Sequence, residues 1–336
     1  MALGEFALIE RYFRAAGATR SDVPLGVGDD GAILRPPAGF DLVAVSDTLV
    51  AGVHFPQGAA PRSIGHRALA VNLSDIAAMG ATPAWALLSL TLPAVEESWL
   101  AEFSAGLGAL ARSHEVALVG GDTTRGPLTL GVQVLGFVPE GQGLRRSGGR
   151  PGDLLCVSGT PGDAAAGLAL LQRASARPAV PTAKVSSSNL SAALATLQQR
   201  FEYPTPRLAL GARLRTLASA CIDVSDGLYG DADKLAAASG CAVQIDPERV
   251  PRSAALAAAV SAGVFTADEG ANFVGAGGDD YELLFTVPPA AIAHLQPDID
   301  RGEISVIGTL QSGSGLWLLE HGVPKAATAG GFDHFG

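Results

Sequence analysis

Residues 61–79, "PRSIGHRALAVNLSDIAAM", predict one long helix in the N-terminal part of the chain. Its apolar residues, Ile64 and Val71 among them, recur at helical spacing and fall near one stripe. Gly80 suits the position at which the helix ends. The apolar run that follows, "AWALLSLTLP" (84–93), predicts a buried strand, so helix and strand alternate here.

The segments on either side extend this pair into an α+β domain. The same patterns predict a second helix at 96–113 and further strands at 31–35, 41–48, 115–120 and 128–138. In chain order this gives strand, strand, helix, strand, helix, strand, strand. Helices that alternate with strands in this way cover one face of a sheet.

A second domain is expected after a linker. Residues 139–153 are rich in Gly and Pro, and 336 residues are more than one hydrophobic core usually holds. We therefore predict an N-terminal domain at 1–140 and a C-terminal domain of strands and helices at 150–336. Within the latter, the Pro- and Ser-rich run at 173–206 predicts irregular structure, part of it a surface insertion.

Composition and charge exclude several classes of protein. The formal net charge of −10 argues against a nucleic-acid partner, because binding a phosphate backbone needs a basic surface. No apolar run approaches the ~20 residues of a membrane span, and residues 1–13 predict an amphipathic helix, not a secretion signal. Cys156, Cys221 and Cys241 lack C-x-x-C spacing and predict free thiols. We therefore expect a cytoplasmic protein without a membrane partner.

Six short acidic clusters at the ends of apolar runs are the most informative feature for function. They contain Asp29 with Asp30, Asp47, Asp75, Asp122, Asp223 with Asp226, and Asp279 with Asp280. Mg²⁺ takes oxygen ligands and is often held by one or two carboxylates together with phosphates and waters. Neighbouring glycines let a phosphate approach the backbone. Together the clusters predict a Mg²⁺-dependent phosphate site.

Each cluster also has an explanation that needs no metal. An aspartate after glycine at the end of a strand is a common turn former. The "VSDG" at 224–227 can cap a helix through Ser225 or Asp226. Asp75 differs, because it lies in a helical, largely apolar stretch where an unpaired carboxylate is costly. A bound cation, a buried partner and a solvated position all stay open for Asp75.

Other catalytic patterns are missing from the sequence. The chain holds no G-x-x-x-x-G-K-[ST] phosphate loop, no protein-kinase motif set and no nucleophile elbow. His54 and His66 are isolated and form no zinc pattern.

Seven motifs, in order along nearly the whole chain, together resemble the bacterial thiamine-monophosphate kinases of the aminoimidazole-ribonucleotide-synthetase superfamily of ATP-binding enzymes. They are "GDDGA" (28–32), "SDTLVAGVHF" (46–55), "NLSDIAAMGATP" (72–83), "GGDTTRG" (120–126), "DVSDGL" (223–228), "GGDDYELLFT" (277–286) and "GFDHF" (331–335). The second motif paired with the last two favours this member of the superfamily.

The resemblance implies a fold and an activity. The family transfers a phosphoryl group from ATP to thiamine monophosphate with several Mg²⁺ ions, giving thiamine diphosphate and ADP. It implies a ferredoxin-like N-terminal α/β layer that pairs into a barrel in a homodimer. It also implies a C-terminal domain of mixed sheet and helices, with the nucleotide in the groove between domains.

The resemblance also implies roles for individual residues. The metal ligands would be Asp30, Ser46, Asp47, Asp75, Asp122, Asp223 and Asp226. ATP would contact Gly121, Asp122, Arg146 and Ser225, and the thiamine substrate would contact His54, Asp279 and Phe332. The chain departs from the family at Asp279, where Glu is usual, and the run at 173–206 is not part of the pattern.

The acidic clusters suit this chemistry. A phosphate monoester has a second pKa near ~6, so the acceptor is largely a dianion at neutral pH and needs no general base. The obstacle is repulsion, about 4 kcal/mol between unit charges at ~4 Å and an effective dielectric of 20. Mg²⁺ can offset it and align the attack. Arg146 would bind nucleotide phosphates or be a solvated linker arginine, and Phe332 would offer the cationic thiazolium an aromatic face.

Three alternatives stay open at this stage. Another enzyme of the superfamily, such as a selenophosphate synthetase or a hydrogenase-maturation enzyme, would share the acidic turns. A non-catalytic Mg²⁺-nucleotide sensor would also need them, but no second substrate pocket. A Mg²⁺-dependent phosphohydrolase would release inorganic phosphate.

Overall fold

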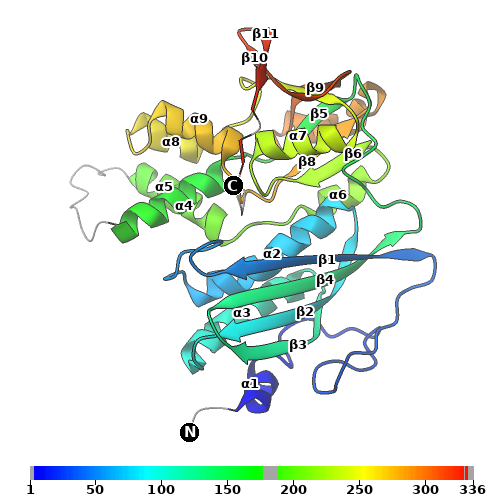
Figure 1. Ribbon diagram of the computed structural model, residues 1–336, viewed down its shortest axis with the longest axis vertical. Helices are drawn as coiled ribbons and strands as arrows, with labels where there is room; N and C mark the ends of the chain where they lie inside the picture. Colours follow the sequence, from blue (N-terminus) through cyan, green and yellow to red (C-terminus); the bar gives the residue numbers. More distant parts are fainter. Residues whose placement is uncertain (1–3, 177–187, 329, 332–336) are drawn as a thin grey trace. The chain divides into compact units, whose positions relative to one another are not determined.

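The computed structural model describes residues 4–176, 188–328 and 330–331. The chain is a mixed α/β protein of two compact units, residues 1–143 (unit 1) and 144–336 (unit 2), each described here by itself (Figure 1). Among the helices of the described ranges, none is both long enough and apolar enough to cross a membrane.

Unit 1 is a four-stranded sheet with two long helices on one face (Figure 1). Its described elements are α1 (Glu5–Tyr12), β1 (Phe40–Val50), α2 (Pro61–Ala78), β2 (Thr82–Leu92), α3 (Glu97–Ser113), β3 (Ala117–Arg125) and β4 (Thr129–Pro139). The strand order is β1-β4-β2-β3, with β2 and β3 parallel and the other pairs antiparallel.

Alternation along β4 explains why helices cover only one face. Leu130, Val132 and Val134 are buried on the side of α2, whereas the alternate residues Gln133 and Leu135 are only half-buried. The sheet therefore has a helix-covered face and a second face, which we call the open face.

A small second core closes one end of the open face. Trp85 is 1% exposed and packs edge-on against Phe137, with 5.0 Å between ring centroids. Val23, Ala32 and Leu34 of the N-terminal loop pack on this pair. The loop that carries Asp29 and Asp30 is thereby tied to the sheet.

Unit 2 is a seven-stranded mixed sheet with helices. Its described strands are β5 (Leu154–Ser158), β6 (Ala220–Asp223), β7 (Ala242–Ile245), β8 (Leu283–Val287), β9 (Ile304–Gln311), β10 (Gly315–Glu320) and β11 (Val323–Ala327), in the order β11-β10-β7-β9-β5-β8-β6. Its described helices are α4 (Asp163–Ala176), α5 (Ser188–Glu202), α6 (Leu208–Leu214), α7 (Leu228–Ala238), α8 (Ala254–Ser261), α9 (Ala267–Ala276), the 3₁₀ helix η1 (Pro289–Leu295) and α10 (Gln296–Asp300).

Two expectations about local structure were wrong. The run 31–35 forms no strand, only an isolated bridge at Ile33, because prolines follow it directly and remove ladder donors. In the run 173–206, residues 188–202 form the regular helix α5, which buries Leu197 and Phe201. The Ser- and Pro-rich composition hid the helical spacing of those apolar residues. Residues 177–187 of that run lie outside the described ranges.

Candidate active site

Strand register brings a row of small and polar side chains onto the open face of unit 1. Asp122 lies opposite Ser89 on the neighbouring parallel strand, and Ser89 lies opposite Gly131 of β4. In the next row Gln133 lies opposite Ser46 and donates a hydrogen bond from Nε2 to its Oγ at 3.4 Å. The sheet thus places two predicted ligands, Asp122 and Ser46, on one face.

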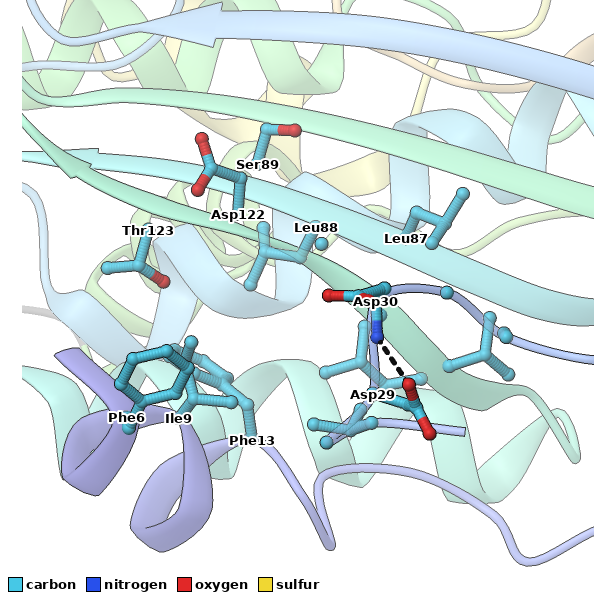
Figure 2. A pocket seen from close by; sticks show the side chains of 18 of the residues that line it. Phe6, Ile9, Phe13, Asp29, Asp30, Leu87, Leu88, Ser89, Asp122 and Thr123 are labelled. Atoms are coloured by element: carbon cyan, nitrogen blue, oxygen red, sulfur yellow. Dashed lines mark hydrogen bonds between the residues drawn. The ribbon is translucent and has the colours of Figure 1, made fainter. Parts of the chain in front are cut away.

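A pocket of about 680 Å³ lies over this row (Figure 2). Its polar lining includes the carboxylates of Asp29, Asp30 and Asp122, together with Ser89 and Thr123. Figure 2 shows Phe6 and Ile9 of α1, together with Phe13 directly after this helix, on the other side of the pocket. The pocket thus combines an acidic wall with an apolar wall.

Gly121 fixes the path of β3 beside the pocket. Its φ is +150°, and a Cβ at this position would lie 1.8 Å from the Leu88 carbonyl oxygen. Only glycine tolerates so close an approach of the two strands. The backbone before Asp122 is therefore held at a defined position.

The acidic turn of Asp29 and Asp30 is open to water. Asp29 and Asp30 are both exposed, and the Asp30 backbone N–H donates to Asp29 Oδ1 at 2.8 Å (Figure 2). Water screens the repulsion between the two carboxylates to about 1 kcal/mol at ~4 Å. The pair is therefore tolerable in the turn and remains accessible to a cation.

Asp47 and Asp75 belong to the helix-covered side. Asp47 lies opposite the buried Val132, and its backbone N–H donates to Asn72 Oδ1 at 3.1 Å. Asn72 and Asp75 are three residues apart in α2 and lie on the same side of that helix. The predicted ligands of unit 1 therefore form two groups, one on each side of the sheet.

His54 follows β1 and is oriented by the backbone. Its Nδ1 accepts a hydrogen bond from the Val50 N–H at 2.9 Å. In the neutral ring the proton then resides on Nε2, which makes Nε2–H a donor.

In unit 2, two of the acidic motifs lie side by side. The backbone of Val224 exchanges hydrogen bonds with Tyr281 and Glu282, and the Asp279 N–H donates to the Ser225 carbonyl at 2.8 Å. These bonds continue the β6–β8 ladder beyond the strands. Asp223, Ser225 and Asp226 are thus next to the loop that carries Asp279, the residue predicted to contact the substrate.

A buried carboxylate that the sequence argument missed holds the 225–226 turn. Asp231 Oδ2 accepts the backbone N–H groups of Ser225 and Asp226, each at 3.0 Å. Lys234 donates to Asp231 Oδ1 at 2.9 Å and also pairs with Asp226. Burial raises the pKa of Asp231, and Lys234 opposes that rise. The i,i+3 spacing of Asp231 and Lys234 on a helix was the available signal.

Asp279 has an unusual backbone. Its φ is +72°, and Tyr281, at +52°, donates from its hydroxyl to Asp279 Oδ1 at 3.1 Å. Aspartate adopts the left-handed region more readily than most residues.

The other predicted site residues of this part of the chain are Arg146 and Phe332. Arg146 is exposed, and its backbone carbonyl accepts a hydrogen bond from Ser239 Oγ at 3.2 Å. Phe332 lies outside the described residues.

The donor chemistry fits Mg²⁺, although the described side chains do not form a closed site. Within residues 4–176, 188–328 and 330–331, no group of three or more His, Cys, Asp or Glu side chains could hold a metal ion. Mg²⁺ usually keeps several waters and binds through one or two carboxylates plus substrate phosphates. Asp30 and Asp122 in the pocket match that kind of donor set.

Comparisons with known proteins agree over the whole chain. Residues 28–138 match the N-terminal domain, and residues 150–317 the C-terminal domain, of AIR synthase related proteins. The thiamine-monophosphate kinase of Salmonella typhimurium is 43% identical over 340 residues, covering 100% of this chain and 99% of the relative.

Two solved structures are also similar. The crystal structure of thiamine-monophosphate kinase from Stenotrophomonas maltophilia shares 44% identity, with a TM-score of 0.81 over 95% of this chain and 97% of that one. The structure of AaThiL complexed with AMPPCP and TMP shares 30% identity, with a TM-score of 0.77 over 90% of this chain and 89% of that one.

Proposed function

The chain belongs to the thiamine-monophosphate kinases, and from that membership we propose that it transfers the γ-phosphoryl group of ATP to thiamine monophosphate. The products are thiamine diphosphate and ADP. The observation that carries the proposal is the full-length identity of 43% to a curated kinase of this activity. A structure at 30% identity that is complexed with AMPPCP, an ATP analogue, and TMP supports both substrates.

The metal in this proposal is Mg²⁺, in several ions. In unit 1, Asp30 and Asp122 would hold it from the pocket, with Ser46 on the same face and Asp47 and Asp75 on the helix-covered side. Asp223 and Asp226 of unit 2 would add further ligands. When bound, Mg²⁺ neutralises phosphate charge and orients the transferred group.

The side chains of this protein would contribute by binding and orienting the substrates. Gly121, Asp122, Arg146 and Ser225 would contact ATP. The attacking oxygen belongs to a phosphate that is already largely dianionic, so no side chain needs to remove a proton from it. Catalysis then depends on position and on compensation of charge.

The thiamine substrate would meet three residues. His54 would donate from Nε2–H, because its Nδ1 already accepts the Val50 N–H. Asp279 would face the cationic thiazolium, with its carboxylate oriented by Tyr281. Phe332 would offer an aromatic face, which suits a cation.

The assembly and location are part of the proposal. Unit 1 would be a ferredoxin-like layer that carries the ATP and metal residues, and two copies would pair their sheets into a barrel. Residues 150–336 would complete the substrate site. The exposed apolar residues Phe40 and Leu42 on β1 support pairing of this kind. A cytoplasmic enzyme fits the three buried, unpaired cysteines.

The decisive experiment supplies ATP, Mg²⁺ and thiamine monophosphate and follows thiamine diphosphate by chromatography. We expect thiamine diphosphate and ADP in equal amounts, and no product when Mg²⁺ is chelated. Release of inorganic phosphate instead of thiamine diphosphate would identify a phosphohydrolase. Binding of ATP without turnover of any acceptor would identify a nucleotide sensor.

A further inference from the structure

A buried carboxylate with three partners lies at the end of the acidic loop of unit 2. Glu282 is fully buried, and its side chain accepts hydrogen bonds from Arg200 Nη2 (2.7 Å), Arg207 Nε (2.6 Å) and Ser158 Oγ (2.5 Å). Burial raises the pKa of Glu282, but the bonds and charges of Arg207 and Arg200 outweigh burial and leave the pKa lowered. The carboxylate is therefore ionised and held between two guanidinium groups.

The partners come from distant parts of the chain. Arg200 belongs to α5 and Arg207 follows that helix, 82 and 75 residues before Glu282. Gly159 leaves room for the carboxylate, because a Cβ there would lie 2.2 Å from Glu282 Oε1. The residue after β5 and the segment of α5 and its C-terminal extension thus both accommodate one side chain of the loop.

A second carboxylate anchors the same loop two residues earlier. Asp280 is 1% exposed and accepts the backbone N–H groups of Gly162 (2.7 Å) and Ala164 (3.2 Å) at the start of α4. Asp280 and Glu282 are therefore both fixed to the body of unit 2.

Two residues of this loop, the one before Asp280 and the one between Asp280 and Glu282, have the left-handed backbone conformation. The φ angles of Asp279 and Tyr281 are +72° and +52°. A non-glycine residue keeps such a conformation only when the surrounding structure enforces it. The buried side chains of Asp280 and Glu282 supply that constraint. The Tyr281 hydroxyl, fixed by it, donates a hydrogen bond that orients the Asp279 carboxylate.

We propose that Arg200 and Arg207 are positioning residues: by holding Glu282 they fix the loop that presents Asp279 to the thiazolium of the substrate. This inference rests on the proposed kinase function and on the proposed role of Asp279. It also gives α5, which lies in the run whose role the sequence left open, a part in substrate binding.

The test compares Arg200→Met and Arg207→Met with the wild type in steady-state kinetics. We expect the KM for thiamine monophosphate to rise about tenfold or more, while the KM for ATP stays within about twofold. Arg200→Lys keeps the positive charge beside Glu282 but not the planar guanidinium, so it should raise the thiamine-monophosphate KM less, by about threefold. Arg213→Met is the matched control, because Arg213 pairs with the buried Asp298 and not with the loop.

Each outcome decides. An unchanged thiamine-monophosphate KM in the folded variants would overturn the inference, as would an equal rise in both KM values. If the methionine variants do not fold, Arg200→Lys decides, because it should still raise only the thiamine-monophosphate KM.

Hydrogen exchange at residues 278–282 is a readout independent of turnover. We expect faster exchange in the Arg200 and Arg207 variants than in Arg213→Met, and unchanged exchange would contradict the inference. A wild type that makes no thiamine diphosphate would refute the proposed function. The exchange result would still test whether Arg200 and Arg207 fix the loop through Glu282.

Discussion

Individual carboxylates of this chain differ sharply in what surrounds them. Asp30 and Asp122 line an open pocket, whereas Asp231, Asp280 and Glu282 are buried and hold backbone or arginine partners. A carboxylate in water is available to a cation, while a buried one must be satisfied by the protein itself. Substitutions of the exposed carboxylates should therefore affect activity, and substitutions of these three buried carboxylates should affect structure.

Asp122→Asn tests the first part of that division. We expect kcat/KM to fall by ~100-fold or more, because a lost ligand removes several kcal/mol of charge stabilisation. The free energy of unfolding should change by no more than ~0.5 kcal/mol, since the side chain is exposed. Glu96→Gln, at an exposed carboxylate outside the pocket, is the control. Near wild-type turnover of Asp122→Asn at limiting Mg²⁺ would show that Asp122 is not a ligand.

Asp280→Asn tests the second part through pH. Burial raises the pKa of Asp280 well above its ordinary value of 3.8, despite the two backbone N–H groups that it accepts. Stability that depends on the neutral form is complete below about pH 4 and is lost as pH rises through the folded-state pKa. The Asp280→Asn variant cannot titrate at this position. The free energy of unfolding of the wild type should therefore fall relative to that of the variant as pH rises above about 4. Urea unfolding from pH 4 to 8 measures this difference, and a constant difference would contradict it.

The sequence could indicate the exposed carboxylates and the buried Asp223 and Asp280 of the acidic clusters, but not the buried Glu282. Asp30 and Asp122 stand beside glycines at the ends of apolar runs, a local pattern. Glu282 is held by a hydrogen bond from Arg200, which lies 82 residues away in the sequence. No local sequence pattern predicts that pairing. Asp231 could have been identified from the sequence, because Lys234 is three residues away, at the i,i+3 spacing of a helix, and both lie on α7.

At the scale of elements, periodic segments were predictable and irregular ones were not. The helix expected at 61–79 is α2 (Pro61–Ala78), and the strand expected at 84–93 is β2 (Thr82–Leu92). Both have long uninterrupted apolar patterns. The exposed edge strand β11 carries no such signal, because its sequence, with Pro324, lacks an apolar alternation.

Leu197→Ala tests whether α5 is an integral part of unit 2. Leu197 is fully buried in the main cluster of the unit, so its loss should cost ~2–5 kcal/mol in the free energy of unfolding. Gln199→Ala, at an exposed position of the same helix, should change it by less than ~0.5 kcal/mol. Urea unfolding measures both. Equal stability of the two variants would mean that α5 is a surface addition after all.

At the scale of the whole molecule, the open face of unit 1 is the feature that an isolated chain leaves unexplained. The loop around Val23 and Ala32 covers Trp85 and Phe137 on this face, but Phe40 and Leu42 on the neighbouring β1 remain 46% and 50% exposed. The β1 strand is also an edge of its sheet. Exposed apolar side chains on an edge strand mark a surface that another chain covers. The proposed pairing of two copies would cover it.

Leu42→Asp tests that pairing. In a two-fold dimer the substitution acts twice, and it replaces apolar burial worth ~1.5–3 kcal/mol per leucine with a charge that must be desolvated. We expect light scattering to give a dimer mass for the wild type, twice the 34.0 kDa of one chain, and a monomer mass for the variant at micromolar concentration. Val95→Asp is the matched control, since Val95 is a 41% exposed valine in the connection between β2 and α3, on no strand edge, and should leave the dimer intact. If Leu42→Asp stays dimeric while folded, the two copies pair through another surface, and a wild type that is monomeric would remove the barrel from the proposal.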